Sequence, residues 1–348
     1  MNMMARVAAR GELWRQSKIA CDLGSPFVGA VLDAGERQLY RAPRTAALIA
    51  GWPDDRSAAA LAMRFNAALH AIARRGEPPI LAALYRREHG DFDAAVGAAL
   101  DLCDAFVEEW MRDPPQTNEV ARSAALAAAL MVVRQETGLP AELFELGSSC
   151  GLNLNLTRYA FDLGGVCAGD PQSPVRVAPV WRGPAPRPAP IALVAARGVD
   201  LRPLDPANEA NRERLLSHIW ADQTARLRRL EKALDLACVH RPRVDRADAV
   251  QWLPQRLEEP ARAGVCRVVF HSMVLQYLEP ADRTKIVAAL HAAGAQANEH
   301  HPLAWIGLEW TPTREEVQLS LTLWPTGDRR VLAVCHPYGE WIDWRHRS

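Results

Sequence analysis

The sequence has no long uninterrupted apolar segment. Its longest apolar run, residues 124–133, is bounded by Arg122 and Arg134, and it is far shorter than the roughly 20 residues that a membrane-spanning helix needs. Residues 1–20 mix apolar and basic side chains and lack the continuous apolar core of a secretory signal. We therefore expect a cytoplasmic protein that neither crosses nor binds a membrane.

Matched cysteine spacings and an excess of one charge are also missing. The seven cysteines are scattered, and none forms a C-x-x-C pair, so we expect reduced thiols and neither a disulfide framework nor a bound metal. The 41 basic and 41 acidic side chains give a formal net charge of zero. This balance argues against a nucleic-acid partner. We expect a small-molecule substrate.

The composition is that of an ordinary globular protein. Of the 348 residues, 49% are hydrophobic and 24% are charged, which suggests one large domain or two moderate ones with a sizeable core. The character of the chain changes near residue 140. We therefore expect a helical N-terminal domain over residues 1–139 and a second domain over residues 140–348.

Residues 1–139 are rich in Ala and Leu and are divided by Gly–Pro clusters. Four apolar residues spaced four, four and three apart lie on one helical face: Leu61, Phe65, Leu69 and Ile72. A further helix is expected over residues 119–137, between Asn118 and Gly138. Because that helix is apolar on all sides, we expect it to be buried. The segment forms a helical domain, or a helical cap whose last helix packs on the sheet that follows.

From residue 140 onward, predicted strands alternate with helices. Strands are expected over residues 144–147, 191–195, 198–201, 244–249, 266–271 and 303–309, followed by a hairpin of residues 317–323 and 331–334. Helices are expected over residues 206–236 and 282–295. A proline-rich insertion covers residues 161–190, within which residues 175–181 could form an edge hairpin strand. This alternation predicts a Rossmann-like α/β fold with a mostly parallel sheet and a terminal antiparallel hairpin.

The most informative stretch is Glu145-Leu-Gly-Ser-Ser-Cys-Gly151, which follows the first predicted strand. Leucines at positions 152, 154 and 156 then allow the chain to enter a helix. A strand, a glycine-bearing turn and a helix N-terminus direct backbone N–H groups and a partial positive charge at a ligand, so we expect a nucleotide or carboxylate site. Glu145 lies inside an apolar strand, where it either stabilises the turn as a buried carboxylate or lies near the ligand.

This stretch resembles the E-x-G-x-G-x-G motif of class I S-adenosylmethionine-dependent methyltransferases. Glu145, Gly147 and Gly151 match the motif, whereas Ser149 stands at the middle glycine. The resemblance covers about residues 140–348. It implies that S-adenosylmethionine is the cofactor and that it binds along the loop of residues 145–155.

The same resemblance implies the positions of the other cofactor contacts. In that family an acidic residue ending the second strand binds the ribose hydroxyls, which points to Asp200, with Asp205 as a rival. An acidic residue after the third strand lies near the adenine, which points to Asp248 and Ala249. The implied cofactor-binding set is Glu145, Gly147, Ser149, Gly151, Asn153, Asp200, Asp248 and Ala249.

The next two strands end in polar residues, His271-Ser272 and Glu309. The fourth strand carries chemistry or substrate contacts in many members of that family, so the resemblance implies a catalytic region here, facing the helical domain. Methyl transfer is a direct displacement, so positioning matters more than acid–base power. His271 is a candidate general base for an acceptor that must lose a proton, or equally a satisfied core histidine.

The whole chain is also similar to a bacterial family with a domain of unknown function, family 2332. Four stretches carry that similarity: residues 24–27 (GSPF), 145–154 (ELGSSCGLNL), 200–205 (DLRPLD) and 270–277 (FHSMVLQY). The similarity supports a helical N-terminal part and a C-terminal part of the kind that binds nucleotides. It implies no established activity.

Two other functions remain open. The replacement of a glycine by Ser149 favours a non-catalytic protein that senses a nucleotide-type ligand or serves as an interaction module. Residues 147–151 also satisfy G-x-S-x-G, the nucleophile motif of serine hydrolases, with Ser149 followed by Asp245 or Asp248 and then His336. The helical character of everything before Ser149 counts against the hydrolase, which needs several strands there. Cys150 is expected to be a small buried residue rather than a reactive thiol.

Overall fold

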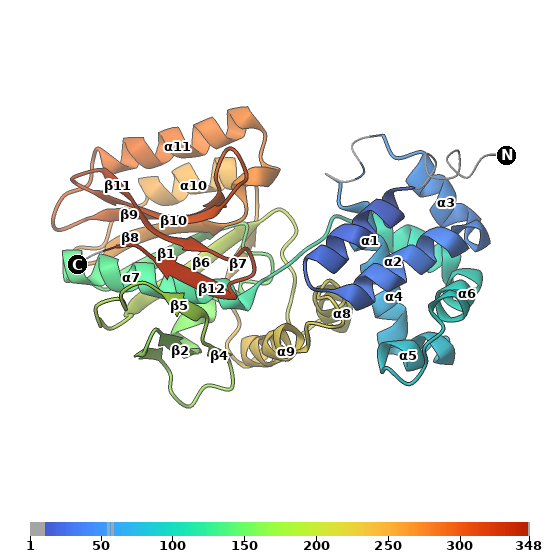
Figure 1. Ribbon diagram of the computed structural model, residues 1–348. Helices are drawn as coiled ribbons and strands as arrows, with labels where there is room; N and C mark the ends of the chain where they lie inside the picture. The colour runs from blue at the N-terminus through green and yellow to red at the C-terminus, as the bar shows by residue number, and fades with distance from the viewer. Residues whose placement is uncertain (1–10, 54–55, 57–58, 347–348) are drawn as a thin grey trace. The chain divides into compact units, whose positions relative to one another are not determined.

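A computed structural model describes residues 11–53, 56 and 59–346. The chain divides into two compact units (Figure 1). The first comprises Met1–Thr117 with Glu209–Arg228, and the second comprises Asn118–Asn208 with Arg229–Ser348. The predicted absence of a signal peptide rests on residues 1–20, and residues 1–10 of that segment lie outside the described residues. In the part of the chain that is described, no helix has the length and apolar character to cross a membrane.

The first unit is helical. Its helices are α1 (Glu12–Asp22), α2 (Pro26–Gln38), α3 (Pro43–Ala50), α4 (Leu61–Arg75), α5 (Pro79–Tyr85), α6 (Phe92–Arg112), α8 (Glu209–Ser217) and the beginning of α9 (Thr224–Val239), with a short 3₁₀ turn η2 (Leu39–Arg41). Proline occupies the first turn of α2, α3 and α5, where its missing N–H is not needed. The predicted apolar face of α4 is buried, so the periodicity argument is confirmed.

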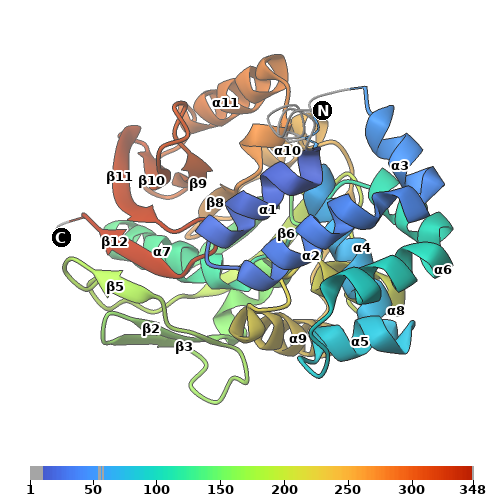
Figure 2. The same ribbon diagram turned by 45° about the vertical axis from the view of Figure 1, so that its right-hand side comes forward.

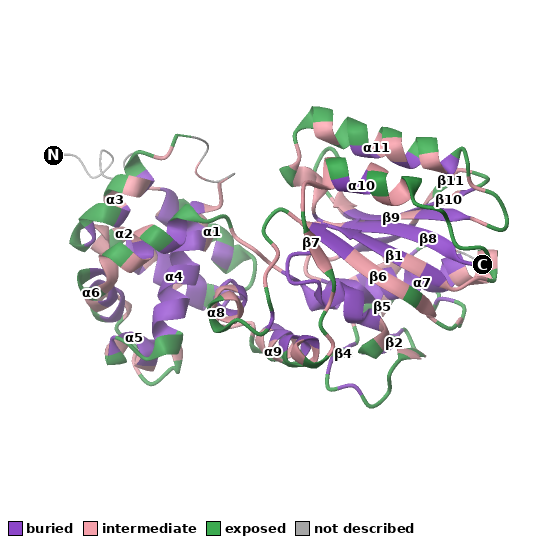
Figure 3. Ribbon diagram, turned by 180° about the vertical axis from the view of Figure 1, so that it is seen from behind, coloured by how far each residue is buried: buried purple, intermediate pink, exposed green. Residues whose placement is uncertain are grey.

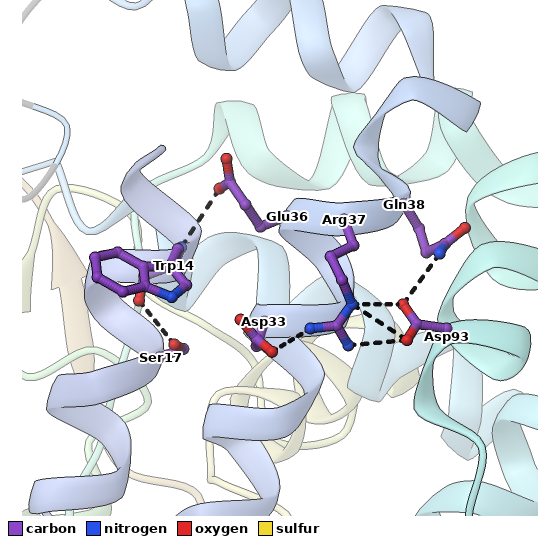
Figure 4. Close-up of polar contacts among 7 residues, drawn as sticks. All are labelled: Trp14, Ser17, Asp33, Glu36, Arg37, Gln38 and Asp93. Carbon is purple, nitrogen blue, oxygen red and sulfur yellow. Dashed lines mark hydrogen bonds and ion pairs between the residues drawn. The ribbon is translucent and has the colours of Figure 1, made fainter. Parts of the chain in front are cut away.

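Charged side chains join the helices of this unit at its surface (Figure 4). The guanidinium of Arg37 on α2 donates two parallel hydrogen bonds of 2.9 Å to the carboxylate of Asp93 on α6. It also pairs with Asp33 one turn earlier on α2. The Glu36 carboxylate accepts hydrogen bonds from the backbone amides of Gly11 and Trp14, at the start of α1. Helix α2 is thus tied to a helix on each side.

A buried histidine explains why residues 209–228 belong with the N-terminal helices. The ring of His70 on α4 is 5% exposed, and its Nδ1 lies 3.2 Å from the Ser217 carbonyl oxygen and 3.0 Å from that of Ile219. Burial lowers the pKa of His70 to about 4, and it lowers the pKa of His218 to about 4 as well. Both rings are therefore neutral near pH 7, with Nδ1 donating to backbone carbonyls.

The second unit is built around a nine-stranded sheet with the order β5-β12-β11-β10-β9-β8-β1-β6-β7. The strands are β1 (Ala141–Leu146), β5 (Val180–Arg182), β6 (Leu193–Asp200), β7 (Val244–Arg246), β8 (Cys266–Ser272), β9 (Leu303–Trp310), β10 (Val317–Trp324), β11 (Asp328–Cys335) and β12 (Trp341–Trp344). Strands β7, β6, β1, β8 and β9 are parallel, and β10 and β11 form an antiparallel hairpin beside β9. The predicted α/β fold, mostly parallel with a terminal antiparallel hairpin, is confirmed.

Helices cover both faces of this sheet (Figure 2). Helices α10 (Ala249–Glu258) and α11 (Pro280–Gly294) pack together on one face, over Phe144, Val269 and Leu303. Helix α7 (Ser123–Thr137) contacts β9, β10 and β11. Residues 123–133 of α7 are buried all round, as expected from their apolar composition, and the strands beside them are largely buried too (Figure 3).

Several local predictions were wrong in detail. The proline-rich insertion contains a separate small sheet of β2 (Ala160–Leu163), β3 (Val166–Gly169) and β4 (Arg176–Val177). The expected edge hairpin over residues 175–181 is divided between two sheets, because β4 pairs with β2 while β5 pairs in parallel with β12. Pro179 lies between them and has no N–H to continue a ladder.

Element boundaries elsewhere also differ from the sequence-based expectation. The two strands expected over residues 191–195 and 198–201 are one continuous strand, β6. The expected helix over residues 206–236 is two helices, α8 and α9, interrupted around Trp220. Strand β12 was not predicted, since its four residues carry two tryptophans and an aspartate without a long periodic pattern.

Candidate functional site

The strand order places a switch point at β1. From β1 the chain adds β6 and β7 on one side, then returns to add β8 and β9 on the other. In open parallel sheets, ligands bind outside the carboxyl ends of the strands where the order reverses. Three predicted site regions lie at this end of the sheet: the loop after β1, Asp200 at the end of β6, and His271-Ser272 at the end of β8.

The loop after β1, residues 147–151, is built on left-handed backbone conformations. Gly147, Ser149 and Gly151 have φ values of +67°, +52° and +71°. A Cβ at Gly147 would lie 2.6 Å from a methyl group of Val274, and one at Gly151 would lie 2.7 Å from Pro242. Both glycines are therefore required by the approach of the protein's own side chains. Ser149 adopts a conformation that non-glycine residues rarely adopt, at a cost of order 1–3 kcal/mol.

The helix expected after this loop was a wrong prediction. Residues 152–158 form the 3₁₀ helix η4 (Leu152–Arg158), and the chain then enters β2. The leucines at positions 152, 154 and 156 are all buried, and their period of two does not match an α-helix. The side-chain amide of Asn155 donates to the His240 carbonyl oxygen at 2.8 Å. The loop is therefore not followed by the α-helix N-terminus that the sequence analysis expected.

Asp200 holds the loop from the neighbouring strand. Its Oδ2 accepts a hydrogen bond from the Ser149 backbone amide at 2.8 Å, and its Oδ1 accepts one from the Arg202 amide at 2.9 Å. The rival acidic residue, Asp205, is exposed and accepts a hydrogen bond from the Ala207 amide. The Asp200 carboxylate therefore contacts the backbone of the loop directly.

Glu145 is a buried carboxyl group beneath the loop. It is 3% exposed, and its Oε1 accepts a hydrogen bond of 2.9 Å from the side-chain amide of Asn153. Within residues 11–53, 56 and 59–346, neither Glu145 Oε2 nor Asn153 Oδ1 has a hydrogen-bond partner. Burial raises the pKa of Glu145 to about 8. The group is therefore mostly a neutral carboxylic acid at pH 7, able to donate as well as accept.

Asp248 and Ala249 lie where the chain leaves β7 and enters α10. The Asp248 side chain caps the helix, accepting a hydrogen bond from the Val250 amide at 2.9 Å. Strand β6 separates β7 from β1 in the sheet, so this pair is two strands away from the loop after β1. Asp200, predicted to contact the ribose of the cofactor, is the last residue of β6. Asp248 and Ala249, predicted to lie near its adenine, follow the adjacent strand β7.

His271 and Glu309 are joined at the ends of β8 and β9. His271 is 1% exposed, and its Nδ1 lies 2.7 Å from Glu309 Oε1. Its Nε2 accepts a hydrogen bond of 2.8 Å from the indole N–H of Trp305. Because an indole N–H can only donate, the neutral ring carries its proton on Nδ1 and donates it to Glu309. Both ring nitrogens of the predicted base are used internally.

Ser272 borders a small cavity together with Arg122, Asn153 and His271. The cavity volume is about 10 Å³, which is room for one water molecule at most. The Ser272 hydroxyl oxygen is buried, and no described residue gives it a hydrogen-bond partner. The rest of its lining is apolar, and the cavity has no space for an acceptor substrate.

Two of the residues proposed for a serine hydrolase, Asp245 and His336, follow or lie on strands that are far apart in the sheet. The Asp245 carboxylate is engaged by Arg197 at 2.6 Å and by the Trp252 indole N–H at 2.6 Å. Asp245 lies on β7, whereas His336 directly follows β11, six strand positions away in the sheet. These two side chains do not form the Asp–His pair that a nucleophile at Ser149 needs. Cys150 is fully buried, as expected.

Two residues that support the site were missed by the sequence analysis. Asn118 was taken as a helix start signal, yet its buried side-chain amide donates to the Ser148 carbonyl oxygen at 3.0 Å. Val274 covers Gly147 from the end of β8. Neither contact has a local sequence signal, because each joins segments far apart in the chain. In the described part of the chain, no three His, Cys, Asp or Glu side chains are grouped so as to hold a metal ion.

Comparison with known proteins gives one match. A family described as "Uncharacterized protein conserved in bacteria (DUF2332)" matches residues 10–344. No curated protein and no solved structure matches the chain.

Proposed function

The chain belongs to the DUF2332 family of bacterial proteins, and we propose that it binds S-adenosylmethionine and transfers the methyl group to a small-molecule acceptor. One observation carries the proposal. At the switch point of the sheet, Asp200 at the end of β6 contacts the backbone of the glycine-bearing loop that ends β1. An acid and a glycine loop on adjacent parallel strands are what a nucleoside with a charged extension requires.

The residues at the site fit the chemistry of that cofactor. Its amino-acid end carries a carboxylate and an ammonium group. Neutral Glu145 can donate a hydrogen bond through Oε2, and Asn153 Oδ1 can accept one; both atoms lack a partner among the described residues. Each oxygen of Asp200 accepts one hydrogen bond within the protein and can accept another from a ribose hydroxyl.

Bound S-adenosylmethionine would supply a methyl group activated by its sulfonium sulfur. The protein's own contribution is then binding and orientation, because a displacement needs alignment rather than a base. Asp200 holds the loop after β1 through the Ser149 amide. Glu309 accepts hydrogen bonds from the amides of Val274 and Leu275 and so fixes the segment that covers Gly147. His271 acts as a positioning residue for Glu309.

A second function, ligand sensing without transfer, is favoured by two observations. Both nitrogens of His271 are occupied, and the cavity beside Ser272 is too small for a substrate. A protein that binds the cofactor without a methyl acceptor needs neither group to react. The two functions share the binding step and differ only in turnover.

The binding step is tested by thermal unfolding with S-adenosylmethionine and with S-adenosylhomocysteine. A ligand at 100 times its dissociation constant stabilises the folded state by about 2.7 kcal/mol, which corresponds to a rise of about 5–10 °C in the unfolding midpoint. Asp200→Asn should reduce the shift strongly, whereas Asp328→Asn, at an exposed position at the start of β11, should leave it unchanged. If neither compound raises the midpoint, the proposal fails.

Turnover separates the two functions. The protein is incubated with S-adenosylmethionine and fractionated bacterial metabolites, and S-adenosylhomocysteine is measured. A methyltransferase produces it in a fraction-dependent manner. A sensor binds the cofactor and produces none with any fraction.

A further inference from the structure

A larger cavity lies at the other end of the sheet, between α10, α11 and the first residues of β8 and β9. Its volume is about 400 Å³, within the range of roughly 300–1,000 Å³ that is typical of small-molecule pockets. Strand β8 has seven residues, so at about 3.3 Å per residue its two ends lie ~20 Å apart. The cavity is therefore separate from the loop after β1, and what it binds does not depend on the function proposed above.

Short side chains on α11 leave this space open. Ala289, Ala292 and Ala293 recur at helical spacing along α11 and line the cavity, together with Leu257 of α10 and Leu303 of β9. Elsewhere in the same layer, larger side chains fill the space between helices and sheet: Trp252, Ile286, Leu290 and Trp324. Among the described residues that line the cavity there is no Phe, Tyr or Trp, so its apolar surface is aliphatic.

The charged side chains of the lining are already paired or solvated. The buried guanidinium of Arg267 donates hydrogen bonds to two backbone carbonyl oxygens, and its Nε lies 3.6 Å from the Glu142 carboxylate. Glu259 pairs with Arg256 at 2.6 Å. The remaining carboxylate, Glu258, is exposed to solvent. A charged ligand would bring an ion without a partner into aliphatic surroundings, which is costly, so the cavity favours a neutral ligand over an anion or a cation.

An uncharged polar group of the lining indicates what such a ligand should carry. His301 lines the cavity, and its buried Nδ1 lacks a hydrogen-bond partner among the residues that the structure describes. A buried polar atom without a partner is unfavourable. A hydroxyl group both donates and accepts, so it can bond to Nδ1 whichever ring nitrogen carries the proton. The lining therefore suits an aliphatic chain with a hydroxyl group at one end.

We propose that this cavity is a binding site for a neutral medium-chain aliphatic alcohol. The hydrocarbon chain lies against the alanines of α11, where it replaces water over apolar surface, and the hydroxyl group pairs with His301 Nδ1. A volume of about 400 Å³ is that of a site for a free small molecule. No covalent step is involved.

1-Octanol is the probe, titrated by isothermal calorimetry and by thermal unfolding of the full chain. At a saturating concentration it should raise the unfolding midpoint by about 5 °C. Octanoate and octylamine have a chain of the same length with a negative or a positive charge, and each should bind at least about tenfold more weakly. 1-Butanol keeps the hydroxyl group but buries less apolar surface, and it should also bind at least about tenfold more weakly.

Matched variants locate the binding. Ala292 lines the cavity at an exposed position, so Ala292→Phe should leave the protein folded and weaken 1-octanol binding about tenfold or more. Ala281→Phe, at an exposed position in the first turn of the same helix, should leave binding unchanged. His301→Leu removes the ring nitrogen and should weaken 1-octanol about threefold or more. The proposal is overturned if 1-octanol does not bind, if octanoate or octylamine binds equally well, or if either Ala292→Phe or His301→Leu leaves the affinity unchanged.

Discussion

Glu309 Oε1 lies 2.7 Å from His271 Nδ1 and 2.9 Å from the backbone nitrogen of Val274. One carboxylate oxygen therefore connects the ends of two adjacent strands to the segment that covers Gly147. The tautomer of His271 follows from its other neighbour, the Trp305 indole, so the chain Trp305–His271–Glu309 has a single direction of hydrogen-bond donation.

Glu309→Ala should destabilise the second unit by about 1.5–3 kcal/mol, because hydrogen bonds to a charged acceptor are lost while their donors stay buried. Urea unfolding measures the change. Glu315→Ala, at an exposed position, serves as the control and should stay within about 0.5 kcal/mol of the parent. Equal stability of the two variants would contradict the positioning role given to Glu309.

Glu145 should make the second unit less stable as the pH rises. Its pKa is about 8 in the folded state and near 4.3 when unfolded, so the folded state retains a proton that the unfolded state loses. Stability is complete below the unfolded pKa and falls as the pH rises toward 8, by an amount on the order of 4 kcal/mol. Glu145→Gln should flatten this dependence.

Chemical unfolding at pH 5 and at pH 8 measures the slope for both proteins. Glu299→Gln, which changes an exposed carboxylate to an amide, should retain the parent's slope. A Glu145→Gln protein with an unchanged slope would show that Glu145 is not the group responsible.

The helical unit should show the opposite dependence on pH. His70 and His218 have pKa values of about 4 in the folded state and near 6.5 when unfolded. As the pH falls from 6.5 to 4, the unfolded state gains protons that the folded state excludes, so stability falls by about 3 kcal/mol for each ring. Hydrogen-exchange protection of α4 and α8, measured at pH 7 and at pH 4.5, should fall at the lower pH. His70→Gln should reduce that fall.

Gly198→Ala should disturb the loop after β1 from the neighbouring strand. An added Cβ would lie 1.9 Å from the Ser148 hydroxyl oxygen, so we expect a loss of about 1–3 kcal/mol in unfolding free energy. Gly90→Ala is the control, because no atom lies within 4 Å of its Cβ position. If the proposed site is correct, Gly198→Ala also weakens S-adenosylmethionine binding.

The sequence predicted the parts of this protein that depend on periodicity and chain order. Alternating strands and helices were sufficient for the α/β fold, and an apolar run without a polar face was sufficient for the buried helix α7. Asp200 was singled out through the resemblance to class I methyltransferases, in which an acidic residue ends the second strand. These signals are local or depend only on order along the chain.

Long-range pairings and local conformational choices were not predictable in this way. Nothing near His271 in the sequence indicates that Trp305, on the adjacent strand β9, donates a hydrogen bond to its ring. In the 3₁₀ helix after the loop, Asn155 donates to the His240 carbonyl oxygen, a partner 85 residues later that nothing near Asn155 in the sequence indicates. The division of residues 175–181 between two sheets likewise depends on β12, more than 150 residues later.

The return of residues 209–228 to the helical unit has a consequence for biosynthesis. Neither unit is a continuous stretch of chain, because β6 is synthesised before α8 and β7 after it. When a ribosome has released the first 117 residues, His70 still lacks the carbonyl groups of Ser217 and Ile219 that receive its hydrogen bonds. The buried pairing of His70 therefore forms only after β1 and β6 have emerged, and the two units complete their folding in an interleaved order.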